Sequence, residues 1–418
     1  MLRYLPAILI LGLVAAAPAD EPKTPTFAAT DWPWWRGPNR DGLAAADQKP
    51  PVKWSETENV LWKAPVPGRG HGAPTVVGDR VFLTAADDSQ WILCFDRKTG
   101  KELWRHEAHR GEVIPKGSPN NAKASYASCT PACDGERIIV NFLNGGAVHA
   151  TAVDLEGKRL WQTKVTDYVL HQGFGSSPTI YQSLAIVSAD NKGTGAIVGL
   201  DRSNGKIVWT RSRPKLPNYA SPIVHAIDGK DQLLFIGCDL VTSLDPLTGK
   251  ELWETKGATT ECVTSTVTDG KLIFTSGGYP KNHVSAVYAD GSGKLAWENK
   301  EQVYVPSMWV RGGHLFAVTD KGSAICWKSD TGVEVWREPL KGTFTASPVP
   351  VGDLVFATSE AGNTFIFKAT PMEFDLVAEN KLGDEVMTTP TICSSRIYMR
   401  VAHKNNGKRE EVLYCIGK

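Results

Sequence analysis

The chain lacks an excess of charge of either sign. Its 418 residues include 46 Lys and Arg against 45 Asp and Glu, so it has no strong field to attract nucleic acid or an anionic membrane. Charged residues make up 22% and hydrophobic residues 42% of the composition, which is ordinary for a folded protein and excludes extended disorder, collagen and a coiled coil. We therefore expect a folded protein with no nucleic-acid partner.

Long hydrophobic runs are also lacking after the first residues. The apolar run at residues 5–17 follows Arg3 and precedes Ala17-Pro18-Ala19. It is too short to span a bilayer, and its order is typical of a signal peptide. We predict a signal peptide at residues 1–19 and an exported, soluble protein, periplasmic or extracellular, with no transmembrane segment. No cysteine follows the run, so the lipid-attachment signal of bacterial lipoproteins is missing.

The eight cysteines lack the common functional spacings. The sequence contains neither Cys-x-x-Cys nor Cys-x-x-Cys-His, so it shows no redox or zinc motif and no c-type haem attachment site. Cys129 and Cys133 are about 13 Å apart along an extended strand, which is too far for a direct disulfide. Any disulfide would therefore have to link different repeats.

What the chain does have is a repeated sequence motif that ends in tryptophan. An apolar strand, an Asp-x-x-Thr/Asn-Gly turn and a second strand recur six times. In this turn Gly accepts a positive φ, so each copy predicts a β-hairpin. With one further upstream Trp, seven tryptophans recur 39 to 57 residues apart, and we predict that they pack between neighbouring sheets: Trp62, Trp104, Trp161, Trp209, Trp253, Trp297 and Trp336.

The repeat predicts an all-β, eight-bladed β-propeller. A further step of 42 residues from Trp336 reaches Ala378 in a strand without Trp, which makes eight units. A period of about 40 to 45 residues with four strands is typical of antiparallel propeller blades. The C-terminal strand at 412–416 lacks a partner, and so does the N-terminal strand at 59–66. We expect these two strands to pair and close the ring.

Three cysteines fit the repeat as packing residues. Cys94, Cys326 and Cys415 occupy the position where other copies have Gly199 or Ser243. Such a position faces a packed sheet, so we expect buried free thiols that take the place of alanine.

The repeat resembles the tryptophan-docking repeat of the pyrroloquinoline quinone (PQQ) propeller family, which includes quinoprotein dehydrogenases and BamB-type assembly factors. The resemblance covers residues 54–418. The Trp-rich stretch at 32–42, followed by Trp54 and the strand around Trp62, is similar to the start of secreted PQQ-like propellers common in planctomycetes. We assign residues 54–418 to the propeller domain and residues 20–53 to a leader and Trp-rich segment, of which 20–31 is expected to be mobile.

Two local features of the sequence allow more than one interpretation. The 57-residue interval between Trp104 and Trp161 indicates an enlarged connection at residues 105–124, which is either functional or a surface flap. His106 and His109 within it have a spacing that binds metal on a helix. The glycines and prolines that follow indicate a loop, and no third ligand is marked, so we predict no metal site.

The connections that lead into the innermost strands of a propeller line the mouth of its central funnel, where ligands usually sit. At these positions the sequence places polar and aromatic residues that suit a sugar, a quinone or a peptide. The ligand-binding candidates are Arg69, His71, Asn121, Lys123, Tyr126, His171, Asn218, Tyr219, Glu261, Tyr304, Trp309 and Glu385, with Gln172, Phe174, Phe344 and Met387 beside them.

For function, the sequence predicts a non-catalytic binding or scaffold protein. We expect its funnel face to bind a protein, a small molecule or a sugar, and we expect the protein to be a monomer. No catalytic residue can be assigned, and no cofactor is predicted.

The resemblance keeps two alternatives open. One is a PQQ- and Ca²⁺-dependent oxidoreductase acting on alcohols or sugars, for which Glu261, Glu385, Asn121 and Asn218 are the only candidates in the funnel to supply oxygen ligands to Ca²⁺. The other is a BamB-like factor for outer-membrane protein assembly. The vicinal Cys-Cys pair of many PQQ alcohol dehydrogenases is absent.

Overall fold

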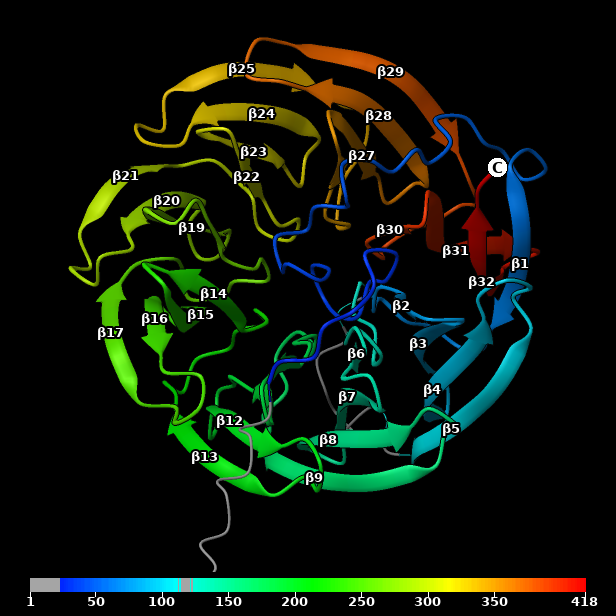
Figure 1. The fold of residues 1–418 in the computed structure, drawn as a ribbon, viewed down its shortest axis with the longest axis horizontal. Coiled ribbons are helices and arrows are strands. Elements are labelled where there is room, and N and C mark those ends of the chain that lie inside the picture. The colour runs from blue at the N-terminus through cyan, green and yellow to red at the C-terminus, as the bar shows by residue number, and fades with distance from the viewer. Residues whose placement is uncertain (1–22, 112, 114–120, 122) are drawn as a thin grey trace, which may run out of the picture.

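The fold is a ring of eight antiparallel sheets around a central axis (Figure 1). The computed structural model describes residues 23–111, 113, 121 and 123–418. Within these residues every regular element is a β-strand, and none of them forms a helix long and apolar enough to cross a membrane. The predicted all-β, eight-bladed propeller is confirmed. The predicted signal peptide lies outside the described residues.

Each blade has four strands that follow one another from the centre to the rim. Blades 1 and 2 consist of β2 (Thr75–Val77), β3 (Arg80–Ala86), β4 (Ser89–Asp96) and β5 (Glu102–Arg110), and of β6 (Ala132–Cys133), β7 (Arg137–Asn144), β8 (Ala147–Asp154) and β9 (Arg159–Asp167). Blades 3 and 4 consist of β10 (Thr179–Tyr181), β11 (Leu184–Ser188), β12 (Ala196–Asp201) and β13 (Ile207–Ser212), and of β14 (Ile223–Ile227), β15 (Lys230–Gly237), β16 (Leu240–Leu244) and β17 (Glu251–Lys256).

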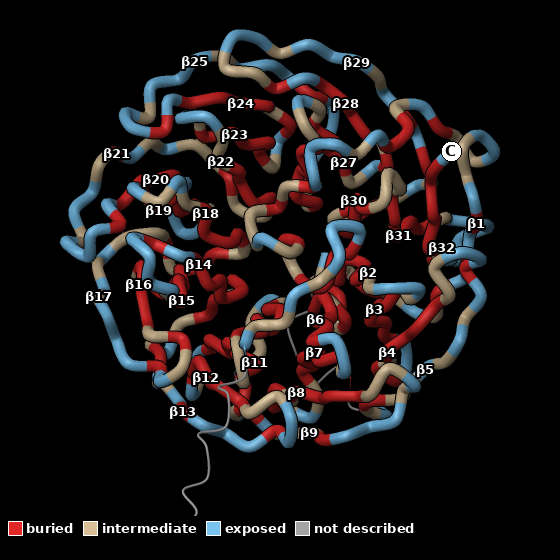
Figure 2. The backbone as a smooth tube through the Cα atoms, in the orientation of Figure 1, coloured by how far each residue is buried: buried red, intermediate tan, exposed pale blue. Residues whose placement is uncertain are grey.

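The second half of the ring repeats this order. Blades 5 and 6 consist of β18 (Val267–Thr268), β19 (Leu272–Gly277), β20 (His283–Tyr288) and β21 (Leu295–Asn299), and of β22 (Trp309–Arg311), β23 (His314–Val318), β24 (Ser323–Lys328) and β25 (Glu334–Pro339). Blade 7 consists of β26 (Val349–Val351), β27 (Leu354–Thr358), β28 (Asn363–Ala369) and β29 (Phe374–Lys381). The inner strands are buried and the outer strands are largely exposed (Figure 2).

Blade 8 joins the two ends of the chain, as predicted. Its strands β30 (Thr391–Cys393), β31 (Arg396–Asn405) and β32 (Lys408–Ile416) are completed by β1 (Val60–Val66). β1 pairs antiparallel with β32, with Trp62 opposite Cys415 and Val66 opposite Glu411. This pairing leaves no gap in the ring.

The repeated tryptophans lie opposite small residues of the third strand in their own blades. Trp209 pairs with Gly199, and a Cβ added to Gly199 would lie 2.3 Å from the Trp209 indole nitrogen. The same position is held by Cys415, Cys94, Ala152, Ser243, Ala286 and Cys326 in the other blades that have Trp. The three cysteines predicted for this position are there, and all eight cysteines of the chain are buried and free.

Six of the seven indoles also reach a turn glycine of the next blade, whereas the Trp336 indole nitrogen donates to the Thr370 carbonyl oxygen in the β28–β29 turn. Gly249 has a φ of +66°, and a Cβ added to it would lie 2.3 Å from the Trp209 ring. The Trp161 indole nitrogen donates to the Arg202 carbonyl oxygen across the same kind of junction, at 3.0 Å. The tryptophans therefore pack between neighbouring blades as predicted, and at six of the seven junctions the turn residue that they contact is a glycine.

Residues 32–44, which we call the plug, cross the centre of the ring (Figure 1). The plug lies on the side of the Asp-x-x-Thr-Gly turns, because Asp31 just before it pairs with Arg97 of the blade 1 turn at 3.3 Å. Its further contacts join six blades: Trp32 with Val76, Pro33 with Cys133, Trp35 with Ser265, Arg36 with Met308, Arg40 with Ile180 and Ala44 with Val351.

The described part of the leader, residues 23–31, contacts the ring and the plug. Thr24 accepts a hydrogen bond from the Gln182 backbone nitrogen at 3.0 Å, and Phe27 packs edge-on against Trp34. Residues 23–31 are therefore held against the ring. The enlarged connection is also shorter than predicted, because residues 105–110 belong to β5.

Replacing a buried repeat tryptophan should destabilise the disc. Trp209 is 8% exposed, so we expect Trp209→Ala to lower the free energy of unfolding by about 3 to 5 kcal/mol, through lost burial and a cavity between blades 3 and 4. Urea titration followed by circular dichroism measures the change. Val208→Ala is the matched control, because Val208 is 56% exposed, and it should change stability by less than about 0.5 kcal/mol. Equal effects of the two variants would contradict the packing described above.

Removing the closing strand should unfold more than one blade. Deleting residues 411–418 takes most of β32 from blade 8 and leaves β1 and β31 with unpaired edges. We expect a large fall in the melting temperature and new proteolytic sites in blades 1 and 8. Deleting Lys418 alone, which lies beyond β32, should leave both unchanged. An unaltered melting curve for the longer deletion would show that the ring does not depend on closure.

Candidate functional site

The candidate site lies on the face opposite the plug, which we call the funnel face. It is formed by the connections into the innermost strands and by the hairpins between second and third strands. Isolated bridges join these two sets of segments in blades 1, 5 and 8: Arg69 with Ala86, Glu261 with Tyr279, and Glu385 with Ala402. These bridges hold three of the predicted funnel residues in fixed positions.

Glu261 is the centre of a first cluster, which we call the Glu261 cluster. Its side chain is 4% exposed and lies 3.2 Å from the His171 Nε2 atom. The Tyr304 hydroxyl donates to the other carboxylate oxygen at 3.1 Å. The Lys192 ammonium lies 3.0 Å from His171 Nδ1. The structure therefore brings three predicted residues together and adds Lys192, which sequence analysis missed.

The hydrogen-bond directions in this cluster are set by lysine. An ammonium group can only donate, so Nδ1 of His171 accepts from Lys192 and Nε2 carries the proton that is donated to Glu261. Burial, followed by the Glu261 charge, raises the pKa of Tyr304 well above its usual value. The same two causes raise the pKa of Tyr219. Both phenols therefore remain protonated, and the buried carboxylate has donors around it.

A second cluster spans the funnel between blades 2 and 7. The Lys123 ammonium lies 2.7 Å from the Glu360 carboxylate, and the Thr345 hydroxyl donates to the same carboxylate at 2.6 Å. Beside it, Asn121 donates to Gln172 at 2.9 Å. Glu360 lies in the β27–β28 hairpin, and sequence analysis did not consider the hairpins between second and third strands.

A third cluster lies where blades 8 and 1 meet, and we call it the seam cluster. Arg409 donates to Glu385 at 2.6 Å, and Arg69 and Lys404 lie 3.6 and 3.5 Å from the same carboxylate. Burial alone would raise the pKa of Glu385, but Arg409, followed by Arg69 and Lys404, holds it below its usual value. Arg409 is a further hairpin residue that sequence analysis missed.

Other predicted funnel residues are buried within the blades or hydrogen-bonded there, away from the three clusters. Asn218 is 4% exposed, donates to Asp190 and to the Ile236 carbonyl, and accepts from the Cys262 nitrogen. Trp309 is 1% exposed in β22 and stacks on Phe316 at 5.2 Å. Phe344 is likewise buried, and Tyr126 is half-buried against the core between blades 1 and 2. Trp309 therefore offers no aromatic surface to a ligand, because its ring is used in the blade.

The two histidines of the His-x-x-His motif lie in a strand, not in the predicted loop. His106 and His109 belong to β5, and the His109 ring lies 4.9 Å from that of His149. Burial, followed by the His149 charge, lowers the pKa of His109 to about 4. Across the described part of the chain, no three His, Cys, Asp or Glu side chains form a group that could hold a metal ion.

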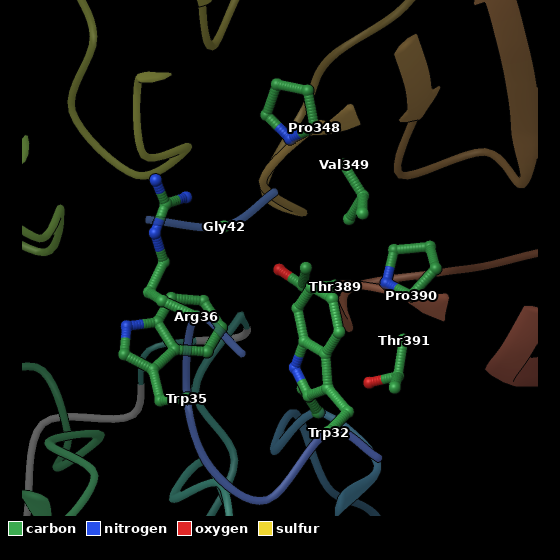
Figure 3. A pocket seen from close by; sticks show the side chains of 10 residues that line it. Trp32, Trp35, Arg36, Gly42, Pro348, Val349, Thr389, Pro390 and Thr391 are labelled. Carbon is green, nitrogen blue, oxygen red and sulfur yellow. The ribbon is translucent and has the colours of Figure 1, made fainter. Parts of the chain in front are cut away.

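The centre of the ring is nearly filled on the plug side. Arg36 is 3% exposed, and its guanidinium donates to the carbonyl oxygens of Asp41 and Met308 at 2.7 and 2.6 Å. Burial lowers its pKa to about 10, against the opposing effect of Asp41. A space beside Arg36 and Trp35 measures about 10 Å³ (Figure 3), which is about the least that admits one water molecule.

Comparison with known proteins identifies relatives of two kinds. The family model described as "Outer membrane protein assembly factor BamB" matches residues 39–168, 89–316 and 280–370. A polyvinylalcohol dehydrogenase of a Pseudomonas species is 33% identical over 186 residues, which cover 40% of this chain and 26% of that protein. The BamB of Burkholderia pseudomallei is 26% identical over 200 residues, which cover 47% of this chain and 45% of that protein.

Solved structures match over nearly the whole ring. A europium-containing methanol dehydrogenase superposes with a TM-score of 0.67 at 12% identity, covering 93% of this chain and 98% of that one. At this identity the match supports the fold alone. The chain spans less than half the length of the two curated relatives.

The second cluster should make stability depend on pH. Burial would raise the pKa of Glu360, but the hydrogen bonds from Lys123 and Thr345 hold it below its ordinary value of 4.5. A lowered carboxyl pKa adds stability above about pH 4.5, and this stability is lost as the pH falls through the lowered value. Because Lys123 is 60% exposed, we expect at most about 1 kcal/mol.

Urea titrations near pH 6 and pH 3.5 test this expectation. Glu360→Gln should lose less stability between the two pH values than the unaltered protein does. Glu373→Gln, which changes an exposed glutamate in the β28–β29 turn, should behave like the unaltered protein. An unchanged pH dependence in Glu360→Gln would exclude the pair as a source of stability.

Proposed function

Because the chain belongs to the BamB-type family of PQQ-like propellers, we propose that it is an exported binding or scaffold protein that recognises its partner through the funnel face and carries out no catalysis. One observation carries the proposal. The carboxylates of Glu261, Glu360 and Glu385 lie in three separate clusters, and each of the three is engaged by donors of the protein.

The residues do not fit a PQQ and Ca²⁺ site of the kind that the resemblance implies. Calcium needs six to eight oxygen ligands around one point. Glu261 is bonded to His171 and Tyr304, whereas Glu385 is bonded to arginine and lysine. The two candidate amides, of Asn121 and Asn218, are bonded to other residues. Trp309, the aromatic residue that could lie beneath a quinone, is buried against Phe316.

Recognition is supported by the mixture of fixed and accessible groups on the funnel face. Glu261 is buried and oriented, and His171 beside it is 28% exposed. Lys123 is 60% exposed at the other side of the mouth. A binding site typically combines polar groups held in place by their neighbours with groups that a partner can reach. The similarity to BamB favours a protein as that partner.

A quinoprotein oxidoreductase is the second candidate function. The polyvinylalcohol dehydrogenase relative, at 33% identity over 186 residues, favours it. Under this alternative Glu261 would have to exchange at least one of its present hydrogen bonds for a metal or substrate contact. The two functions therefore predict different behaviour of the same carboxylate.

Reconstitution distinguishes the two functions. We expect no stoichiometric binding when PQQ and Ca²⁺ are added to the purified protein, and no dye-linked oxidation of polyvinyl alcohol, ethanol or glucose, because the carboxylates are already paired. Absorbance titration and dye reduction are the measurements. Turnover that Glu261→Gln abolishes and Glu373→Gln preserves would establish the oxidoreductase in place of the binding protein.

Partner recognition can be mapped by site-specific photo-crosslinking in the envelope fraction of the source cells. A photo-reactive residue in place of Lys192, on the funnel face, should give a discrete crosslinked species. The same residue in place of Lys98, an exposed position in the turn of blade 1, should not. Glu261→Gln should weaken the species formed at position 192. Identical patterns at both positions would contradict recognition by the funnel face.

A further inference from the structure

The β28–β29 hairpin of blade 7 is longer than the corresponding hairpins of blades 1 to 6. In blade 4 a single residue pair, Leu244 with Glu251, follows the bulge beside the tryptophan position. The hairpins of blades 1, 2, 3, 5 and 6 also have one pair there. In blade 7 three pairs follow the bulge, and the last of them joins Ala369 with Phe374. The blade 7 hairpin therefore has two more pairs before it turns.

The tip of this hairpin exposes a methionine. Met372 is 88% exposed, whereas every other large apolar residue that the structure describes is at most 56% exposed. Leu376 and Val377, which follow in β29, are 50% and 40% exposed. A single exposed apolar side chain is ordinary, but several that adjoin one another mark an interaction surface. Methionine suits such a surface, because its flexible side chain adapts to the partner.

The apolar surface continues onto blade 6. The Trp336 ring packs against that of Phe374 at 5.9 Å, and its indole nitrogen donates to the Thr370 carbonyl oxygen at 2.9 Å. This part of β25 therefore adjoins the start of β29, and the two strands follow one another on the rim (Figure 1). Val333 and Val335, beside Trp336, are 56% and 38% exposed. We call the exposed apolar residues of the two blades the rim patch: Val333, Val335, Met372, Leu376 and Val377.

Acidic residues predominate in the segments that form the rim patch. Residues 333–339 and 370–381 contain five acids and two bases, whereas the whole chain is balanced, with 45 acids and 46 bases. Ion pairs with residues outside these segments add one base, Lys368, and one acid, Glu301, so the excess of three acids is unchanged. The rim patch therefore combines exposed apolar side chains with negative charge.

We propose that the rim patch docks an amphipathic segment of a partner protein, in which lysine or arginine accompanies the apolar residues. The apolar side chains of that segment would lie against Met372 and its neighbours, where burial removes apolar area from water. Its bases would lie near the acids of β25 and β29, which gives complementary charge. The surface is on the rim, apart from the funnel face, so the inference goes beyond the proposed function and does not depend on it.

Other occupants are less complementary to the rim patch. A second copy of this chain would bring the same negative charge to the interface, and like charges across an interface are unfavourable. The surface of an anionic membrane would be repelled for the same reason. A basic amphipathic segment is complementary in both polarity and charge.

Fluorescence anisotropy at low salt tests the proposal with a short labelled peptide of leucine and lysine. We expect binding at one site per chain with a Kd below about 100 μM, and weaker binding at raised salt. Two counterparts, one with glutamate in place of lysine and one with serine in place of leucine, should each bind at least about tenfold more weakly. No binding of the leucine–lysine peptide, or equal binding of either counterpart, would overturn the proposal.

Variants assign the binding to the rim patch. Met372→Gln should weaken the leucine–lysine peptide about fivefold, because it removes an apolar contact. Leu252→Gln is the matched control, since Leu252 is 49% exposed and precedes the tryptophan of blade 4 as Val377 precedes the equivalent alanine of blade 7. Its affinity should be unchanged. An equal loss in the two variants, or no loss in Met372→Gln, would contradict the assignment.

The test does not depend on folding defects. Because Met372 is 88% exposed, its replacement should leave the melting temperature unchanged. Asp375→Asn changes the charge of the patch without removing apolar surface, and we expect it to weaken the peptide about threefold at low salt. Unchanged affinity in Asp375→Asn would overturn the part that charge plays in the docking.

Sedimentation and vesicle flotation distinguish the other occupants. A dimer, or binding to neutral phosphatidylcholine vesicles, that Met372→Gln abolishes would assign the rim patch to a second copy or to lipid and overturn the proposal. The result is separable from the proposed function. The crosslink at position 192 reports on the funnel face alone, and a failed peptide titration would leave it as it stands.

Discussion

The antiparallel pairing of β1 with β32 is the interaction on which the rest of the molecule depends. Without β1, the outer edge of β32 would present unpaired backbone groups, and such an edge invites pairing with another chain. Because residues 60–66 complete blade 8, the connection that follows them enters blade 1 beside the β31–β32 hairpin. That position brings Arg69 to Glu385 and Arg409. The seam cluster thus exists because the ring closes there.

A second constraint, the volume between neighbouring blades, explains why one sequence motif can recur through the whole ring. Each indole fills space left by a small residue in its own blade, and six of the seven also fill space left by a turn glycine in the next blade. Blade 7 reverses the sizes: Ala378 takes the tryptophan position, and the residue opposite is Ile366. The larger side chain of the pair therefore lies on β28 instead of β29, and a core tolerates such an exchange when apolar atoms still occupy the junction. This compensation is why the step of 42 residues still predicted a blade where the tryptophan is missing.

The blades, their number, the closure and the three packing cysteines could be predicted because each is encoded locally and repeated. The plug is not part of the repeat, and its contacts, such as that of Trp35 with Ser265, join residues far apart in sequence. The sequence therefore indicated a separate Trp-rich segment but not that this segment crosses the centre of the ring. The funnel was predicted in part. The expectation that connections into the innermost strands line the funnel identified Glu261 and His171. It omitted the hairpins between second and third strands, where Glu360 and Arg409 lie. Trp309 was misplaced because its position one residue into β22 makes it a core residue.

For the proposed binding function, the unequal burial of the Lys123–Glu360 pair and the Glu261 cluster indicates where a partner can compete. Separating Lys123 from Glu360 removes an ion pair with an exposed lysine, which is worth at most about 1 kcal/mol. Taking His171 from Glu261 would leave a carboxylate that is 4% exposed without one of its donors, and a buried acceptor that loses its donor costs about 1 to 3 kcal/mol, or more when it is charged. A partner that replaces the first pair therefore loses little, and one that replaces the second must supply an equivalent donor. The Glu261 cluster is thus suited to select among ligands, while the exposed lysine is suited to make the first contact.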